Sequence, residues 1–125
     1  MSFRLLNPTL HGLLDYAAAT GLIVLPFVLD LRTVVPVAHW LSVAAGVGLV
    51  AYSLATDYRF GALRLISFRA HLALDLLAAA AFVVAPFVFG WTGLVRGYYL
   101  VMAAGVLVVV ALSSAGDERV PVTDR

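Results

Sequence analysis

Residues 11–28 read HGLLDYAAATGLIVLPFV, and residues 71–88 read HLALDLLAAAAFVVAPFV. The two stretches share a histidine, an aspartate four residues later, a run of alanines and a closing proline–phenylalanine pair, all at the same offset of sixty residues. An α-helix rises 1.5 Å per residue, so about 20 apolar residues cross the ~30 Å hydrocarbon core of a bilayer. The repeated stretch therefore predicts two membrane-spanning helices, each with one histidine and one aspartate near its start.

The composition of the whole chain supports a membrane location. Of its 125 residues, 63% are hydrophobic and 12% are charged, and the mean hydropathy is +1.03. Soluble domains are about half apolar and a quarter charged, and a chain this short could not bury so much apolar surface in its own core. The absence of cysteine excludes disulfides and thiolate chemistry, and the scattered arginines form no basic stripe for nucleic acid. We therefore predict an integral membrane protein that contacts lipid and has no nucleic-acid partner.

Four membrane spans can be placed along the sequence. Asn7 and Ser67 are expected helix N-caps, and Pro36 suits the first turn of a helix. The fold class is an all-α membrane protein, a bundle of four transmembrane helices in a single domain. The expected spans cover about residues 8–29, 37–56, 68–89 and 95–114; residues 30–33 should form a short loop, 57–66 should lie among lipid headgroups, and 116–125 should be a flexible cytoplasmic tail.

The arginines predict how the bundle is oriented. With four spans, one side of the membrane holds six arginines and the other side holds two. The positive-inside rule then places the N- and C-termini in the cytoplasm and the protein in the cytoplasmic (inner) membrane. Four aromatic residues should lie at the opposite interface, where such rings usually anchor a span: Trp40, Trp91, Tyr98 and Tyr99.

The offset of sixty residues extends beyond the two stretches. Residues 4–59 and 64–119 align without gaps and match at histidine, aspartate, proline and arginine positions, which an alanine-rich composition does not explain. Each repeat holds two spans, so both repeats enter the membrane from the same side. We therefore expect two parallel two-helix repeats around a pseudo-twofold axis along the membrane normal.

These motifs resemble those of a known family. A helix that opens with His-x-x-x-Asp and closes with a proline–aromatic pair occurs twice, with a Tyr-Ser-Leu-x-Thr-Asp-Tyr stretch at 52–58 between the copies. The arrangement resembles the SPW-repeat membrane proteins over about residues 7–117. At the positions of the Ser-Pro-Trp motif, this chain has Leu-Pro-Phe at 25–27 and Ala-Pro-Phe at 85–87. The resemblance implies a bacterial or archaeal four-span protein and implies no established activity.

His11, Asp15, His71 and Asp75 are the candidate site residues, because ionisable groups inside a membrane are costly and usually have a purpose. Each pair lies on one helix face, and the pseudo-twofold axis would bring the pairs together. We favour a polar lock between the repeats, satisfied by water, headgroups and arginines near the cytoplasmic interface. The alternatives are a proton or ion relay, and a haem iron or divalent metal held by His11 and His71. For a metal, the sequence shows no further group that would orient the ligands.

Three other features have structural interpretations. Pro26 and Pro86 should kink their helices or begin a turn near the outer interface. Alanine and glycine runs lie near mid-membrane in all four spans, with Ser42 and Gly46 at small-xxx-small spacing. They should let the helix backbones pack closely and leave no wide polar pore. His39, which precedes a tryptophan, should be an interfacial anchor.

The sequence contains no nucleophile constellation, phosphate loop or cofactor fingerprint, so we expect no enzyme activity and no required cofactor. Our first hypothesis is a structural or partner-binding role, with self-association or attachment to a larger membrane complex. The second is a small proton-coupled transporter or ion carrier, and the third is a haem- or metal-binding membrane protein. A transporter should show a polar cavity that continues beyond the aspartates, whereas a structural protein should show the four side chains satisfying one another.

Overall fold

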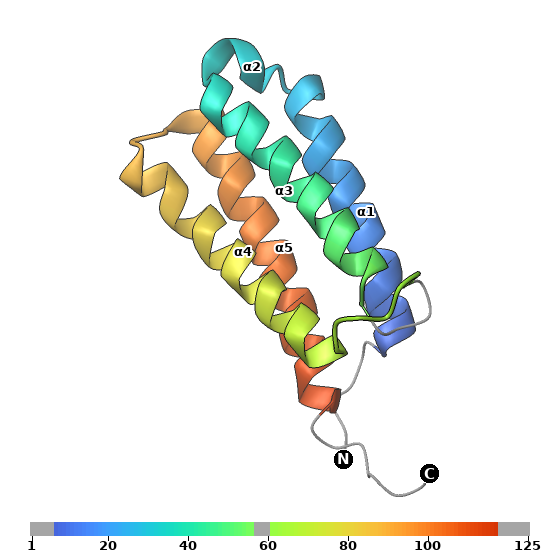
Figure 1. The fold of residues 1–125 in the computed structure, drawn as a ribbon. Helices are drawn as coiled ribbons and strands as arrows, with labels where there is room; N and C mark the ends of the chain where they lie inside the picture. The colour runs from blue at the N-terminus through green and yellow to red at the C-terminus, as the bar shows by residue number, and fades with distance from the viewer. Residues whose placement is uncertain (1–6, 57–60, 118–125) are drawn as a thin grey trace, which may run out of the picture.

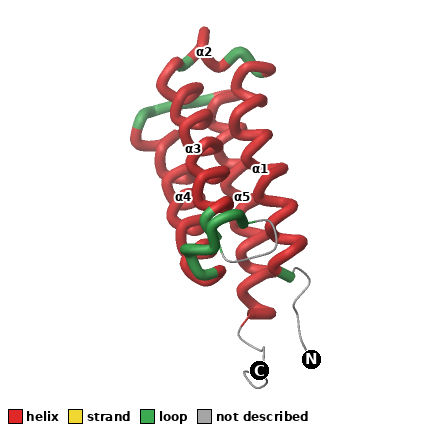
Figure 2. The backbone as a smooth tube through the Cα atoms, turned by 45° about the vertical axis from the view of Figure 1, so that its right-hand side comes forward, coloured by secondary structure: helices red, strands yellow, loops and turns green. Residues whose placement is uncertain are grey.

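The computed structural model describes residues 7–56 and 61–117. Four long helices and one short helix make up most of this part: α1 (Pro8–Val28), α2 (Leu31–Val34), α3 (Pro36–Leu54), α4 (Phe68–Val88) and α5 (Gly93–Asp117) (Figure 1). Short loops join them, and no strand occurs among the described residues (Figure 2). The helices α1 and α3 form one hairpin, and α4 and α5 form the second. The prediction of an all-α bundle is confirmed.

All four long helices are long and apolar enough to cross a membrane. Many large apolar side chains on their outer faces are exposed, as a surface in contact with lipid requires. The start of α1 and the end of α5 lie together at one end of the bundle, and α2 lies at the other (Figure 1). We call these two ends the base and the α2 end.

The helix starts follow the expected capping chemistry. The side chains of Asn7 and Ser67 each accept a hydrogen bond from the backbone N–H three residues later, at 2.8 and 3.1 Å. As a result, α1 and α4 begin, and also end, at positions sixty residues apart. This agreement is what two repeats would give, while the pseudo-twofold axis itself stays a prediction.

Two predicted boundaries differ from the structure. The loop expected at 30–33 contains the short helix α2, because Asp30 turns the chain with a φ of 57° and Leu31 is then buried against the bundle. The fourth span is also longer than expected. It begins at Gly93 and continues to Asp117, so its last residues overlap the expected tail, and residues 118–125 lie outside the described part.

The connection between α3 and α4 folds back on the end of α3. Backbone N–H groups of the loop donate to the carbonyl oxygens of Leu54 and Ala55, which lack helical partners. A Cβ atom on Gly61 would collide with the carbonyl oxygen of Thr56, so this approach requires glycine. Residues 57–60 lie outside the described residues, and the expected headgroup location of this segment stays a prediction.

Small residues pack closely within the first hairpin. A Cβ atom on Gly46 would lie 2.7 Å from Cγ1 of Ile23 and 3.0 Å from the carbonyl oxygen of Ala19, so α3 approaches the backbone of α1 closely here. The same does not hold between the hairpins. Gly48 and Gly105 have no atom within 4 Å of such a Cβ, and both line a cavity between the four helices. The expectation of close packing throughout mid-membrane was therefore wrong between the hairpins, because small side chains cannot fill the space between backbones that stand apart.

Hydroxyl groups join the two hairpins at the α2 end. The Tyr99 hydroxyl donates to the carbonyl oxygen of Ala38 at 2.6 Å, across the hairpins. The Ser42 hydroxyl donates to the carbonyl oxygen of Leu22 at 2.8 Å and lies 2.6 Å from the Tyr98 hydroxyl. Ser42 donates its only proton to the carbonyl, so Tyr98 donates to Ser42.

Pro26 explains why Leu22 needs this partner. In a regular α-helix the carbonyl oxygen of residue 22 would accept from the N–H of residue 26, and proline has none. Ser42 supplies the missing donor from the neighbouring helix. Pro26 and Pro86 lie buried in the last turns of α1 and α4, and the predicted kinks stay predictions.

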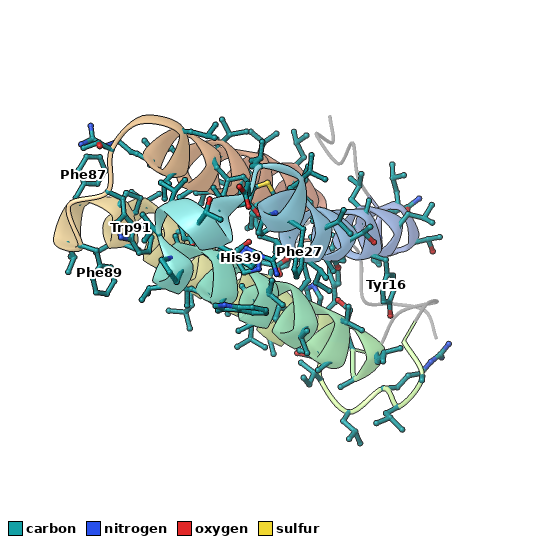
Figure 3. The ribbon with its side chains drawn as sticks, turned by 90° about the horizontal axis from the view of Figure 1, so that it is seen from above. Tyr16, Phe27, His39, Phe87, Phe89 and Trp91 are labelled. Atoms are coloured by element: carbon teal, nitrogen blue, oxygen red, sulfur yellow. The ribbon has the colours of Figure 1, made fainter. Side chains whose placement is uncertain are left out.

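The aromatic residues expected at the outer interface are mostly inside the bundle. Only Trp40 is exposed, at 52%, whereas Trp91, Tyr98 and Tyr99 are buried. Their rings fill the space between helices at the α2 end, and both tyrosine hydroxyls find partners in the other hairpin. These three rings therefore pack inside the bundle, while their location at the outer membrane interface stays a prediction. In the view from above, Trp91 lies between Phe87 and Phe89 at one side of the molecule (Figure 3).

His39 is also buried, so it is not an exposed anchor. Its ring packs edge-on against Phe27 and Trp40, with ring centroids 4.5 and 4.4 Å apart, and Figure 3 shows it beside Phe27. Neither ring nitrogen has a hydrogen-bond partner among residues 7–56 and 61–117. The neighbouring aromatic rings cover the histidine, so its side chain does not reach out as an anchor would, while its location at the outer membrane interface stays a prediction.

Candidate functional site

The structure brings together all four predicted site residues at the base of the bundle. His11 and Asp15 lie one turn apart near the start of α1, and His71 and Asp75 lie at the matching positions of α4. Their exposed fractions are 0, 5, 0 and 4%. We call these four residues the His/Asp cluster. No other group of three or more histidine, aspartate or glutamate side chains converges in this way among the described residues.

Each imidazole contacts both carboxylates. The Nε2 atom of His11 lies 3.1 Å from Oδ1 of Asp15 and 3.1 Å from Oδ2 of Asp75. The Nε2 atom of His71 lies 2.8 Å from Oδ2 of Asp15 and 3.4 Å from Oδ2 of Asp75. Two of these contacts are within a helix and two cross from one hairpin to the other. The cluster is therefore a closed ring of alternating imidazoles and carboxylates.

Hydroxyl groups hold the other nitrogen of each imidazole. The Nδ1 atom of His11 lies 2.8 Å from Oγ of Ser113, on α5. The Nδ1 atom of His71 lies 2.7 Å from Oγ1 of Thr56, just beyond α3. Each histidine thus lies between the carboxylates and a hydroxyl of the opposite hairpin.

Hydrogen-bond geometry assigns one proton of the cluster. The Thr56 hydroxyl donates to the carbonyl oxygen of Tyr52 at 2.5 Å, so it can only accept from His71. His71 therefore carries a proton on Nδ1 and presents Nε2 to the carboxylates. The Tyr52 hydroxyl in turn donates to Oδ1 of Asp75 at 2.6 Å, which leaves Oδ2 to face both imidazoles.

Tyr52, Thr56 and Ser113 were not predicted as site residues from the sequence. One signal was present, since Ser113 and Ser53 are equivalent at the offset of sixty residues. The structure departs from that equivalence. His71 binds Thr56, one turn further along, and the buried Oγ of Ser53 has no partner among the described residues. Only the folded loop after α3 brings Thr56 to His71, and the helical pattern does not predict that loop.

The environment of the cluster also differs from the one expected. Water, headgroups and arginines were expected to satisfy the four side chains near the interface. Instead the side chains are buried, and they contact one another and the three hydroxyls. Arg4 or Arg64 was expected close to the cluster; Arg4 lies outside the described residues, and Arg64 is exposed in the loop before α4. The cause is the helix pairing, since the cluster forms where α1 and α4 face each other and all four long helices surround it.

A cavity of about 250 Å³ lies next to the cluster, between the four long helices. Asp15, Asp75 and Tyr52 form its polar wall, and the rest of its lining is apolar. A second hollow between α1 and α5 shares part of that lining, including Gly105. The cavity thus continues from the carboxylates into apolar surroundings.

The four apolar helices and the closed polar ring within them settle the class of the molecule. The chain is an integral membrane protein. No protein-family model, curated protein or solved structure matches the chain. The likeness to SPW-repeat proteins therefore rests on the sequence motifs alone.

The geometry discriminates between the two kinds of metal site considered from the sequence. A haem held by His11 and His71 would need the porphyrin plane between the two Nε2 atoms. Oxygen atoms of both aspartates already lie there, 2.8 to 3.4 Å from these nitrogens, so a haem does not fit. A single small cation is different, because the four residues each offer one ligand atom within 4.8 Å of the others.

Proposed function

We propose that the chain is a non-enzymatic integral membrane protein with a structural or partner-binding role, in which the His/Asp cluster joins two helical hairpins. The crossed contacts carry this proposal: His11 lies 3.1 Å from Asp75, and His71 lies 2.8 Å from Asp15. Ionisable groups in a membrane are stable only when they are paired. Each hairpin alone would leave a histidine and an aspartate without their partners from the other hairpin, so each hairpin completes the other.

The proposal also covers the family of the chain and its orientation in the membrane. We place the chain among the SPW-repeat proteins on its two His-x-x-x-Asp helices, and its termini in the cytoplasm on the arginine distribution. The outer faces of the helices expose many large apolar side chains, which suit lipid and also further copies of the chain or another membrane protein. Self-association is the partner-binding role that we favour.

A proton or ion relay is the second candidate function. A hydrogen-bonded path favours it, since Ser113, His11 and Asp75 connect to Tyr52 without a break. This path runs from helix to helix at the base, however, and not along the bundle. Towards the α2 end the cavity wall is apolar, and the next buried hydroxyls there, Ser42 and Tyr98, do not line it. A transmembrane relay would need polar groups in that interval, so joining the hairpins is the better-supported function.

The double variant Asp15→Asn/Asp75→Asn separates the two functions. We would reconstitute it and the wild-type protein into liposomes with an internal pH-sensitive dye, and measure thermal unfolding of both in mild detergent. The joining role predicts equal, background proton flux for both proteins and a melting temperature lowered by several degrees in the variant. A wild-type flux that the variant loses at unchanged melting temperature would establish the relay instead.

A further inference from the structure

We infer that the His/Asp cluster is a closed, four-ligand site for one divalent transition-metal ion of the Zn²⁺ class, an inference that rests on the proposed joining role of the cluster. Imidazole nitrogen and carboxylate oxygen are both common Zn²⁺ ligands. The ligand atoms are Nε2 of His11, Nε2 of His71, Oδ2 of Asp75 and one carboxylate oxygen of Asp15. Such an ion would connect α1 to α4 through metal–ligand bonds, which would replace the direct contacts between imidazoles and carboxylates.

The spacing of the ligand atoms fits a tetrahedral ion. Metal–ligand bonds of about 2.0–2.1 Å at tetrahedral angles place neighbouring ligand atoms roughly 3.3 Å apart. Oδ2 of Asp75 lies 3.1 and 3.4 Å from the Nε2 atoms of His11 and His71. Asp15 approaches the same two atoms through different oxygens, Oδ1 at 3.1 Å and Oδ2 at 2.8 Å, and one of these would become the ligand. All four ligand atoms lie within 4.8 Å of one another. Small side-chain shifts would therefore complete the tetrahedron.

Groups around the cluster already orient His11, His71 and Asp75. In metal sites a histidine that binds through Nε2 usually donates its Nδ1–H to an oxygen, which fixes the ring. Ser113 and Thr56 provide that oxygen for His11 and His71. Tyr52 holds Oδ1 of Asp75 and turns Oδ2 inwards. The orienting groups that the sequence did not show are thus present in the structure.

Charge and burial indicate the kind of site. Two carboxylates and two neutral imidazoles around one divalent ion give no net charge, which suits the interior of a membrane. All four ligand residues are at most 5% exposed, and all come from the protein. A site with four protein ligands and no open position is structural, whereas catalytic zinc sites keep one position for water or substrate. The cavity beside the cluster adds no further ligand: its lining is apolar apart from Asp15, Asp75 and Tyr52, and Tyr52 orients Asp75.

The test uses the full chain purified in mild detergent, first for metal content and then, after removal of metal with a chelator, by titration with Co²⁺. Tetrahedral Co²⁺ reports its geometry through visible absorption. We expect about one Zn²⁺-class ion per chain and a tetrahedral Co²⁺ spectrum. Asp75→Asn should lose both, and Tyr52→Phe should weaken Co²⁺ binding by about 10–100-fold. Asp30→Asn, which alters an exposed carboxylate, and His39→Leu, which alters a buried histidine elsewhere, should leave both unchanged.

Failure of the metal inference and failure of the joining role are distinguishable. A wild-type protein with far less than one ion per chain and no Co²⁺ spectrum overturns the metal site, as does binding that Asp75→Asn leaves intact. The melting temperature is then compared in excess chelator. If Asp15→Asn/Asp75→Asn is still less stable than the wild-type protein, the joining role holds without a metal. Equal stability in chelator overturns the joining role.

Discussion

His71 and Asp15 belong to different hairpins, yet their side chains lie 2.8 Å apart, closer than either aspartate lies to the histidine on its own helix. The contact between the hairpins is thus at least as close as the contact one turn along a helix. The stability of the bundle should depend on this crossed pair.

We expect His71→Gln and Asp15→Asn to couple strongly. Removing either partner leaves the other buried without its contact from the opposite hairpin, so the second substitution should cost less than the first. The coupling free energy should be about 1–3 kcal/mol, as for contacting buried residues. Reversible unfolding by SDS in detergent micelles, carried out on the four proteins of the cycle, measures it. Asp30→Asn combined with His71→Gln is the matched control and should be additive; a coupling near zero for the crossed pair contradicts its role.

The serine at position 42 should matter mainly because of the proline at position 26. Ser42→Ala leaves the Leu22 carbonyl oxygen and the Tyr98 hydroxyl without their partner, at a cost of about 1–3 kcal/mol. Pro26→Ala restores a backbone N–H that can bond the Leu22 carbonyl oxygen. In the Pro26→Ala background, Ser42→Ala should therefore cost about 1 kcal/mol less. Equal costs in both backgrounds, measured by the same unfolding assay, would refute this link.

His39→Leu should leave the stability unchanged or raise it. The imidazole is buried and neither nitrogen has a hydrogen-bond partner among the described residues, which costs about 1–3 kcal/mol for an unsatisfied group. Leucine retains the apolar contact with Phe27 and removes that cost. The same substitution at His11, where both nitrogens have partners, should lower the melting temperature by several degrees. A large loss from His39→Leu would show that a partner of this ring exists.

Two glycines on the same helix should respond oppositely to alanine. Gly46→Ala places a methyl group 2.7 Å from Cγ1 of Ile23 and 3.0 Å from the carbonyl oxygen of Ala19, so it should separate α1 from α3 and destabilise by about 1–3 kcal/mol. Gly48→Ala points into open space at the cavity and should be neutral or slightly stabilising, since alanine favours helix over glycine. Comparable losses for both variants would contradict the close approach at Gly46.

Much of the bundle could be predicted because its causes are local. Hydropathy over twenty residues gives a span, and a side chain such as Asn7 caps the helix that follows it. The offset of sixty residues also pointed to His11, Asp15, His71 and Asp75, since rare ionisable residues in apolar helices stand out from their surroundings. The structure brings these four side chains together.

What could not be predicted depends on how the helices stand relative to one another. The alanine and glycine runs are compatible with close contact and also with a cavity, and only the helix positions decide between them. Tyr98 and Tyr99 read as interfacial anchors in the sequence because nothing local shows that Ser42 and Ala38 lie opposite them. The partners of the two histidine Nδ1 atoms likewise come from segments distant in the chain.

The two halves of the cluster depend on different kinds of support. The Nδ1 atom of His11 contacts the hydroxyl of Ser113, which lies inside α5. The Nδ1 atom of His71 contacts the hydroxyl of Thr56, which lies beyond the end of α3. The position of Thr56 depends on the loop that folds back on it, and that loop can approach only because residue 61 has no side chain. The missing side chain of one loop residue, Gly61, thus contributes to the protonation pattern inside the bundle, because the loop it permits accompanies the hydroxyl that accepts the Nδ1 proton of His71.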